Sequence, residues 1–147
     1  FIYDGGDYSS GTVEGGETVD VAGVYSEYYG LSQLDSDDVT VTGVAPVMVP
    51  IDVTDPCSVA TDGVSAELYE SMLIRVFDLT VSDSNPDAPS DYGEFEVNDC
   101  LRIDDQLSDV LIPQPSVGTT YSALSGVLTY TYGHAKLVPR GAEDIDE

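Results

Sequence analysis

Cationic residues are scarce in this sequence. Four Lys and Arg stand against 28 Asp and Glu, which gives a formal charge of −24 over 147 residues. Binding to a phosphate backbone requires clustered cations, and Arg75, Arg102, Lys136 and Arg140 are scattered along the chain. The composition therefore predicts no nucleic-acid partner. A compact chain of this charge repels itself unless cations screen it. The charge therefore indicates either a surface adapted to a salty, divalent-rich medium or specific cations bound among the carboxylates.

Histidine and cysteine are almost absent. His134 is the only imidazole, and Cys57 and Cys100 are the only thiols. They cannot supply a four-ligand zinc site, and a nucleophile would find a single imidazole to serve as its base. No G-x-S-x-G, P-loop or H-E-x-x-H motif occurs. We interpret His134 as a turn or packing residue and predict that the chain is not an enzyme.

The two cysteines leave two interpretations open. A disulfide between Cys57 and Cys100 would close a loop of roughly 40 residues and stabilise the fold by about 4 kcal/mol in the chain-entropy model. The alternative is a pair of buried, unpaired thiols. We expect the disulfide, because nothing else in the sequence is typical of a cytosolic protein. An extracellular or cell-surface location follows from that expectation.

Long apolar runs are also missing, since no stretch approaches the roughly 18 apolar residues of a membrane-spanning helix. The apolar fraction of 41% is still enough to bury a core. The length suits one sizeable domain or two small ones. The sequence opens at Phe1 with neither a Met nor a recognisable signal peptide. We interpret it as a processed product or a fragment.

An internal repeat is the clearest feature that the sequence does contain. Residues 21–34 (VAGVYSEYYGLSQL) match residues 124–137 (LSGVLTYTYGHAKL) at a constant offset, with Gly23 aligned to Gly126. In each copy a β-rich run carries a central glycine, which suits a bulge or a sharp barrel bend. A Tyr-Gly turn and a returning strand follow. The repeat therefore predicts the same strand, turn and strand twice.

Further strand candidates lie between the copies. Residues 38–44 and 73–81 alternate between apolar and polar, residues 47–53 form an apolar run limited to a sheet edge by its prolines, and residues 92–103 form another strand region. Residues 66–72 (AELYESM) are the one stretch with helical character. We predict an all-β protein, an OB-like Greek-key barrel with a second, N-terminally truncated OB-like unit and one short helix.

The repeat also predicts the domain organisation, with a partial OB-like unit at residues 1–55 and an OB-like barrel at residues 56–147. About fifty residues of strands precede the second copy and only about fourteen precede the first. An incomplete barrel leaves unpaired edges, which a strand donated by another chain would fill. In the alternative interpretation, the first copy packs on the second as an added sheet.

Three sequence blocks carry a resemblance to a known group of proteins: residues 19–34, residues 55–81 and residues 124–145. They resemble bacterial extracellular OB-fold modules, which accompany secreted endonuclease/exonuclease/phosphatase-type nucleases and lamin-tail surface proteins. The resemblance implies the OB fold and a catalytic domain in a separate stretch that nothing here matches. OB folds often bind oligonucleotides or oligosaccharides on one face. Aromatics for such a face are present, but the basic groove that single strands need is absent.

The sharpest candidate site is the acidic segment 83–94 (DSNPDAPSDYGE), whose spacing follows a twelve-residue calcium loop. Oxygen-bearing side chains occupy its first, third, fifth, ninth and twelfth positions. The match fails at the sixth position, where Ala88 replaces the turn glycine. The other interpretation is a solvated acidic hairpin loop. The candidate calcium ligands are Asp83, Asn85, Asp87, Asp91 and Glu94.

Together these features predict a non-catalytic, extracellular structural protein that assembles with itself by strand complementation and is stabilised by calcium. The expected partners are further copies of the chain, in a homo-oligomer, polymer or fibre, with contact to a cell surface or glycan. The alternative function is a ligand-binding accessory OB module of a secreted bacterial enzyme, which recognises a glycan or a nucleic acid.

Overall fold

The computed structural model describes residues 2–3, 13–108 and 114–146. The chain is mostly β, as the sequence predicts, with one short helix. It divides into two compact units, Phe1–Val49 and Pro50–Glu147. We call them unit 1 and unit 2 and describe each by itself.

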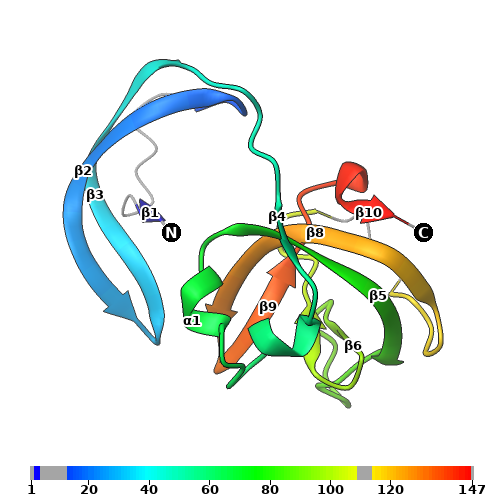
Figure 1. Ribbon diagram of the computed structural model, residues 1–147. Helices are drawn as coiled ribbons and strands as arrows, with labels where there is room; N and C mark the ends of the chain where they lie inside the picture. The colour runs from blue at the N-terminus through cyan, green and yellow to red at the C-terminus, as the bar shows by residue number, and fades with distance from the viewer. Residues whose placement is uncertain (1, 4–12, 109–113, 147) are drawn as a thin grey trace. The chain divides into compact units, whose positions relative to one another are not determined.

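Unit 1 is a three-stranded sheet in the order β1-β3-β2. Strands β2 and β3 form a long antiparallel hairpin, and β1 pairs with β3 in parallel. The hairpin curls into a half-barrel (Figure 1), with register shifts after Thr18 and after Ala22, and such bulges bend a strand. The strands are β1 (Ile2–Tyr3), β2 (Glu17–Tyr28) and β3 (Leu31–Val44).

Unit 2 contains a closed five-stranded barrel. Strands β5, β6 and β7 form an antiparallel meander, β7 pairs in parallel with β9, and β8 joins β9 back to β5. This closed Greek-key order confirms the predicted OB-like fold class. The barrel strands are β5 (Leu73–Asp83), β6 (Phe95–Val97), β7 (Leu101–Ile103), β8 (Thr120–Thr131) and β9 (His134–Val138).

Short elements flank the barrel (Figure 1). Strand β4 runs parallel to β5, and β10 pairs with β8 in antiparallel fashion. Their bounds, with those of the helical turns, are β4 (Ile51–Val53), η1 (Pro56–Val59), α1 (Ala66–Tyr69), η3 (Ala142–Asp144) and β10 (Ile145–Asp146).

Three strand predictions differ from the structure in extent. Residues 38–44 are the end of the longer strand β3, and within residues 47–53 only β4 is a strand. The region 92–103 divides into β6 and β7, because Asn98 and Asp99 take positive φ values of 53° and 58° and turn the chain. Cys100 therefore follows a tight turn.

The core of unit 2 is formed by inward-facing apolar side chains of all five barrel strands. On β5 the alternation skips a residue, so that Val76 and Leu79 are both buried. Asp78 lies at this irregularity and has a positive φ of 54°. The amide of Asn98 holds it, donating to the Asp78 carbonyl at 3.1 Å and accepting from the Thr80 N–H at 2.8 Å.

A disulfide joins Cys57 to Cys100, which confirms the predicted bridge. Cys57 lies in η1, before the barrel, and Cys100 directly precedes β7. The side chain of Asp55 caps η1 by accepting from the Cys57 N–H at 3.0 Å. The bridge therefore anchors the entry segment of unit 2 to the barrel wall.

The repeat is one structural element present twice, at an offset of 103 residues. Strands β2 and β8 are each 12 residues long, and their bounds differ by that offset. The two hairpins turn at matching residues with matching backbone angles: φ is 50° and 90° at Tyr29 and Gly30, and 52° and 86° at Tyr132 and Gly133. Two successive positive φ values are those of a type I′ hairpin turn.

The central glycines of the two copies are required for the same structural reason, the close approach of a neighbouring backbone carbonyl. A Cβ on Gly23 would lie 2.3 Å from the carbonyl oxygen of Asp35, and a Cβ on Gly126 would lie 2.6 Å from that of Val138. Asp35 and Val138 are themselves equivalent by the repeat offset. In both hairpins, neighbouring backbones approach too closely for any side chain at this position.

The equivalence extends to a third strand. Strand β1 pairs in parallel with β3 through Ile2 and Leu34, as β7 pairs with β9 through Ile103 and Leu137. The order β1-β3-β2 of unit 1 thus corresponds to β7-β9-β8 of unit 2. Among the described residues, unit 1 contains no counterpart of β5 or β6.

Candidate functional site

A pocket of about 590 Å³ opens on unit 2. Its walls come from the β5–β6 loop with Tyr92 and Glu94, from β7 with Arg102, and from the β8–β9 hairpin with Tyr132 and Lys136. In OB folds, the face of the second and third barrel strands and the loops 1–2 and 4–5 bind ligands. Counting β5 as the first barrel strand, this pocket lies at the same place.

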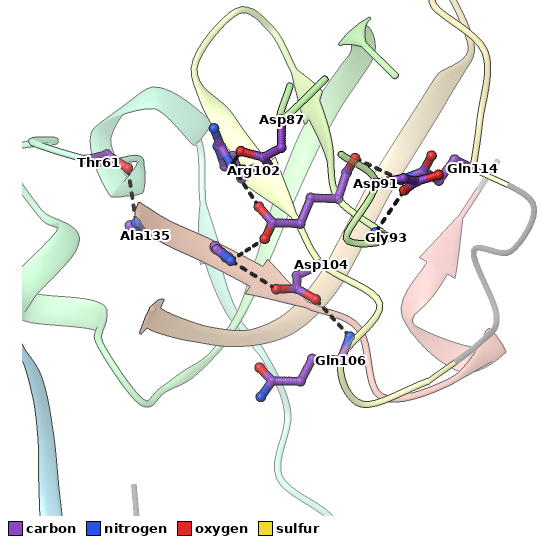
Figure 2. Close-up of polar contacts among 11 residues, drawn as sticks. Thr61, Asp87, Asp91, Gly93, Arg102, Asp104, Gln106, Gln114 and Ala135 are labelled. Atoms are coloured by element: carbon purple, nitrogen blue, oxygen red, sulfur yellow. Dashed lines mark hydrogen bonds and ion pairs between the residues drawn. The ribbon is translucent and has the colours of Figure 1, made fainter. Parts of the chain in front are cut away.

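Lys136 anchors the floor of the pocket, although its side chain is only 2% exposed. The ammonium donates to Glu94 Oε1 and, at 3.2 Å, to Asp104 Oδ2. A buried ammonium is tolerated only with such partners. Asp104 also accepts from the backbone N–H of Gln106 at 2.9 Å (Figure 2), which orders the segment after β7.

Arg102 forms the second cationic centre. Its Nη1 lies 3.0 and 2.9 Å from the two oxygens of Asp87, and 2.9 Å from Glu94 Oε2 (Figure 2). Burial lowers the pKa of Arg102, but the hydrogen bonds that it donates to Glu94 and Asp87 outweigh this effect and leave the pKa above its ordinary value. Glu94 bridges the two cations, so the loop and strands β7 and β9 form one ionic network.

The predicted calcium ligands are distributed over different roles. Asp83 accepts from the backbone N–H of Asn85 at 2.9 Å, and Asp91 accepts from that of Gly93 at 3.1 Å, so both carboxylates stabilise turns. Asp87 and Glu94 do lie close to each other, but both form ion pairs with Arg102. Within residues 2–3, 13–108 and 114–146, no group of three or more His, Cys, Asp or Glu is placed to hold a metal.

Calcium binding by the 83–94 loop stays a prediction, and the network makes its test specific. An ion that took Asp87 and Glu94 as ligands would have to displace Arg102. If the loop binds calcium, adding Ca²⁺ to the metal-free chain raises the melting temperature, and Asp83→Ala reduces that rise. A melting temperature that ignores both Ca²⁺ and chelator contradicts the prediction.

The cations of this site were missing from the sequence-based candidates, which considered only the acidic loop. Arg102 and Lys136 are far apart in the sequence, whereas strands β7 and β9 place them directly opposite each other. A usable signal is present, because Lys136 stands between the apolar residues Ala135 and Leu137 in β9. Arg140, which does not line this pocket, binds Asp144 at 2.7 Å, and the hydrogen bond that it donates lowers the pKa of that carboxyl.

Two tyrosines give the pocket exposed aromatic surface. Tyr132 is 95% exposed and Tyr92 is 68% exposed. The Lys136 ammonium lies 5.7 Å from the centre of the Tyr132 ring. Four carboxylates line the pocket against two strong cations, so an anionic ligand is disfavoured. Aromatic faces beside hydrogen-bonding groups suit a neutral, hydroxyl-rich ligand.

No helix in the described part of the chain is long and apolar enough to cross a membrane. No family model, curated protein or solved structure matches the chain.

Proposed function

We propose that this chain is a non-catalytic structural protein that assembles by strand complementation through the open edge of β2. One observation carries the proposal. Strands β2 and β8 are equivalent, but β5 pairs along β8, whereas among the described residues only β3 pairs with β2. The free edge of β2 is 12 residues long, and such an edge is a template for a strand from another polypeptide.

The exposure of β2 side chains supports the same conclusion. Tyr25 is 65% exposed, while its counterpart Leu128 on β8 is 1% exposed. Val21 is half-buried, while its counterpart Leu124 is fully buried. These positions are apolar in both copies, and a closed barrel buries them only in unit 2. Covering them with a further strand removes apolar surface from water.

The charge and the disulfide indicate the setting of this assembly. A disulfide is typical of oxidising compartments, so we place the protein outside the cell or on its surface. Copies that each carry a formal charge of −24 repel one another. Assembly into homo-oligomers or polymers is therefore expected to strengthen with salt or divalent cations, which screen that repulsion.

A charge substitution on β2 tests the proposal. We expect the mass of the purified chain to rise with concentration and salt, because β2 edges without a donor strand pair with each other once salt screens their like charges, and Val21→Lys to suppress this rise. Val64→Lys is the matched control, since Val64 is 96% exposed in unit 2. Light scattering after size-exclusion chromatography measures the mass. A chain that stays monomeric at every concentration and calcium level, or equal masses for Val21→Lys and the unmodified chain, rejects the proposal.

The pocket of unit 2 favours a second candidate function, recognition of a neutral saccharide. Tyr92 and Tyr132 supply stacking surfaces above the ionic network. For a saccharide identified on a glycan array, Tyr132→Ala is expected to weaken binding about tenfold, equivalent to about 1.4 kcal/mol. Tyr29→Ala is the matched control, because Tyr29 is 82% exposed at the same turn position of unit 1. An array without signal, or equal losses for the two variants, counts against this function.

A further inference from the structure

The barrel of unit 2 specifies which kind of strand completes unit 1. We propose that the occupant of the β2 edge is a strand of a separate polypeptide with the residue pattern of β5. It runs antiparallel to β2 in the register that β5 has with β8. This inference rests on the proposed function and adds the chemistry, direction and alignment of the donor strand.

The register follows from the 103-residue offset. Three pairs define the position of β5 on β8: Leu73–Val127, Val76–Leu124 and Leu79–Tyr121. The repeat places Val24, Val21 and Thr18 at the positions of these three β8 residues. The donor residues that correspond to Leu73, Val76 and Leu79 therefore lie opposite Val24, Val21 and Thr18, in that order.

The inner face of the half-barrel determines the side chains of the donor. On β5 the residues that face the barrel interior, Ile74 and Val76, are fully buried. Ile74 lies opposite Gly126, and Gly23 is the equivalent residue of β2. A donor with apolar residues at alternate positions, one of them opposite Gly23, thus covers the open side of unit 1.

Charge favours a β5-like donor over the β2 strand of a second copy. Strand β2 carries Glu17, Asp20 and Glu27 and no cation, so two β2 strands bring like charges together. A β5-like donor places the residue equivalent to Arg75 opposite Ala22, two positions from Asp20 on the same face. The β5 of a second copy is not free, because it already pairs with β4, β6 and β8.

Cysteine cross-linking with a synthetic peptide tests the register in the full chain. The peptide has the sequence of residues 73–83 (LIRVFDLTVSD). The matched combinations are Val24→Cys in the chain with Leu73→Cys in the peptide, and Val21→Cys in the chain with Val76→Cys in the peptide. The mismatched combinations exchange the two peptides, which separates the thiols by three residues, about 10 Å along the strand. A peptide of the same composition in scrambled order is the control.

We expect the matched combinations to cross-link at least tenfold more than the mismatched or scrambled ones, with the peptide converting multimers of the chain into one-to-one complexes. Mass spectrometry of the cross-linked fragments identifies the joined cysteines, which distinguishes peptide bound to unit 1 from peptide that has replaced β5 in unit 2.

If multimers form and respond to Val21→Lys while matched and mismatched peptides cross-link equally, this inference is overturned and the proposed function stands. Cross-linking between two Val24→Cys chains that persists when the matched peptide is present also overturns it, because the preferred occupant is then a second copy. If the matched combinations cross-link but the chain alone forms no multimers, the inference is supported and only the proposed assembly into homo-oligomers is rejected.

Discussion

Replacing Lys136 with methionine is expected to lower the free energy of unfolding by about 3–5 kcal/mol. The side chain is 2% exposed, and its ammonium neutralises Glu94 and Asp104, which are themselves almost fully buried. Methionine retains much of the length and volume but leaves both carboxylates without this cation. Glu94 keeps Arg102 and Asp104 keeps the N–H of Gln106, but a buried carboxylate that loses its ammonium partner is no longer fully compensated for its lost hydration. Urea denaturation at neutral pH measures the loss.

Two controls separate charge from packing in this experiment. Arg75→Met removes a cation whose side chain is 39% exposed and pairs with Asp146, so its cost is expected to stay within about 1 kcal/mol. Adding Glu94→Gln and Asp104→Asn to Lys136→Met is expected to restore part of the lost stability, since no buried charge then lacks a partner. A loss below about 1 kcal/mol for Lys136→Met would contradict the ionic network as a stabilising unit.

Breaking the disulfide is the second large effect. The bond between Cys57 and Cys100 spans a sequence separation of 43 residues, and cross-linking a loop of that size restricts the unfolded chain by about 4 kcal/mol in the chain-entropy model. The double replacement Cys57→Ser with Cys100→Ser is therefore expected to lower the unfolding free energy by about this amount. The loss includes the anchoring of η1 to the β6–β7 turn.

The reduced, unmodified chain is the control for this replacement. Its denaturation midpoint is expected to match that of the double serine variant, because both lack the cross-link and differ by one atom at each position. Coincident curves for the oxidised and reduced chains would show that the bond does not limit the unfolded state.

The sequence predicted those features of the fold that depend on local chemistry. Gly23 and Gly126, each followed by a Tyr-Gly pair, predicted the two hairpins, and the register of β2 shifts beside Gly23. The repeat also predicted that unit 1 corresponds to the later strands of the barrel and lacks its first strands. The turn at Asn98 and Asp99 was missed, because it uses no glycine and its left-handed residues are fixed by the fold around them.

The candidate site was only half predicted, for a different reason. The spacing of acidic residues in the 83–94 loop resembles a calcium loop, and such spacing is visible within one short segment of the sequence. The partners of Asp87 and Glu94 come from β7 and β9, and the parallel pairing of Arg102 with Lys136 joins residues far apart in sequence. Spacing alone does not reveal that a long-range strand pair supplies the cations.

Hydrogen–deuterium exchange along β2 tests most directly whether unit 1 is half of a barrel. If it is, amides of residues 17–28 exchange faster than those of residues 120–131 in the chain alone, and they become protected when the 73–83 peptide is added. If β2 is as protected as β8 in the monomer, or unchanged by the peptide, the sheet is already complete and needs no strand from elsewhere.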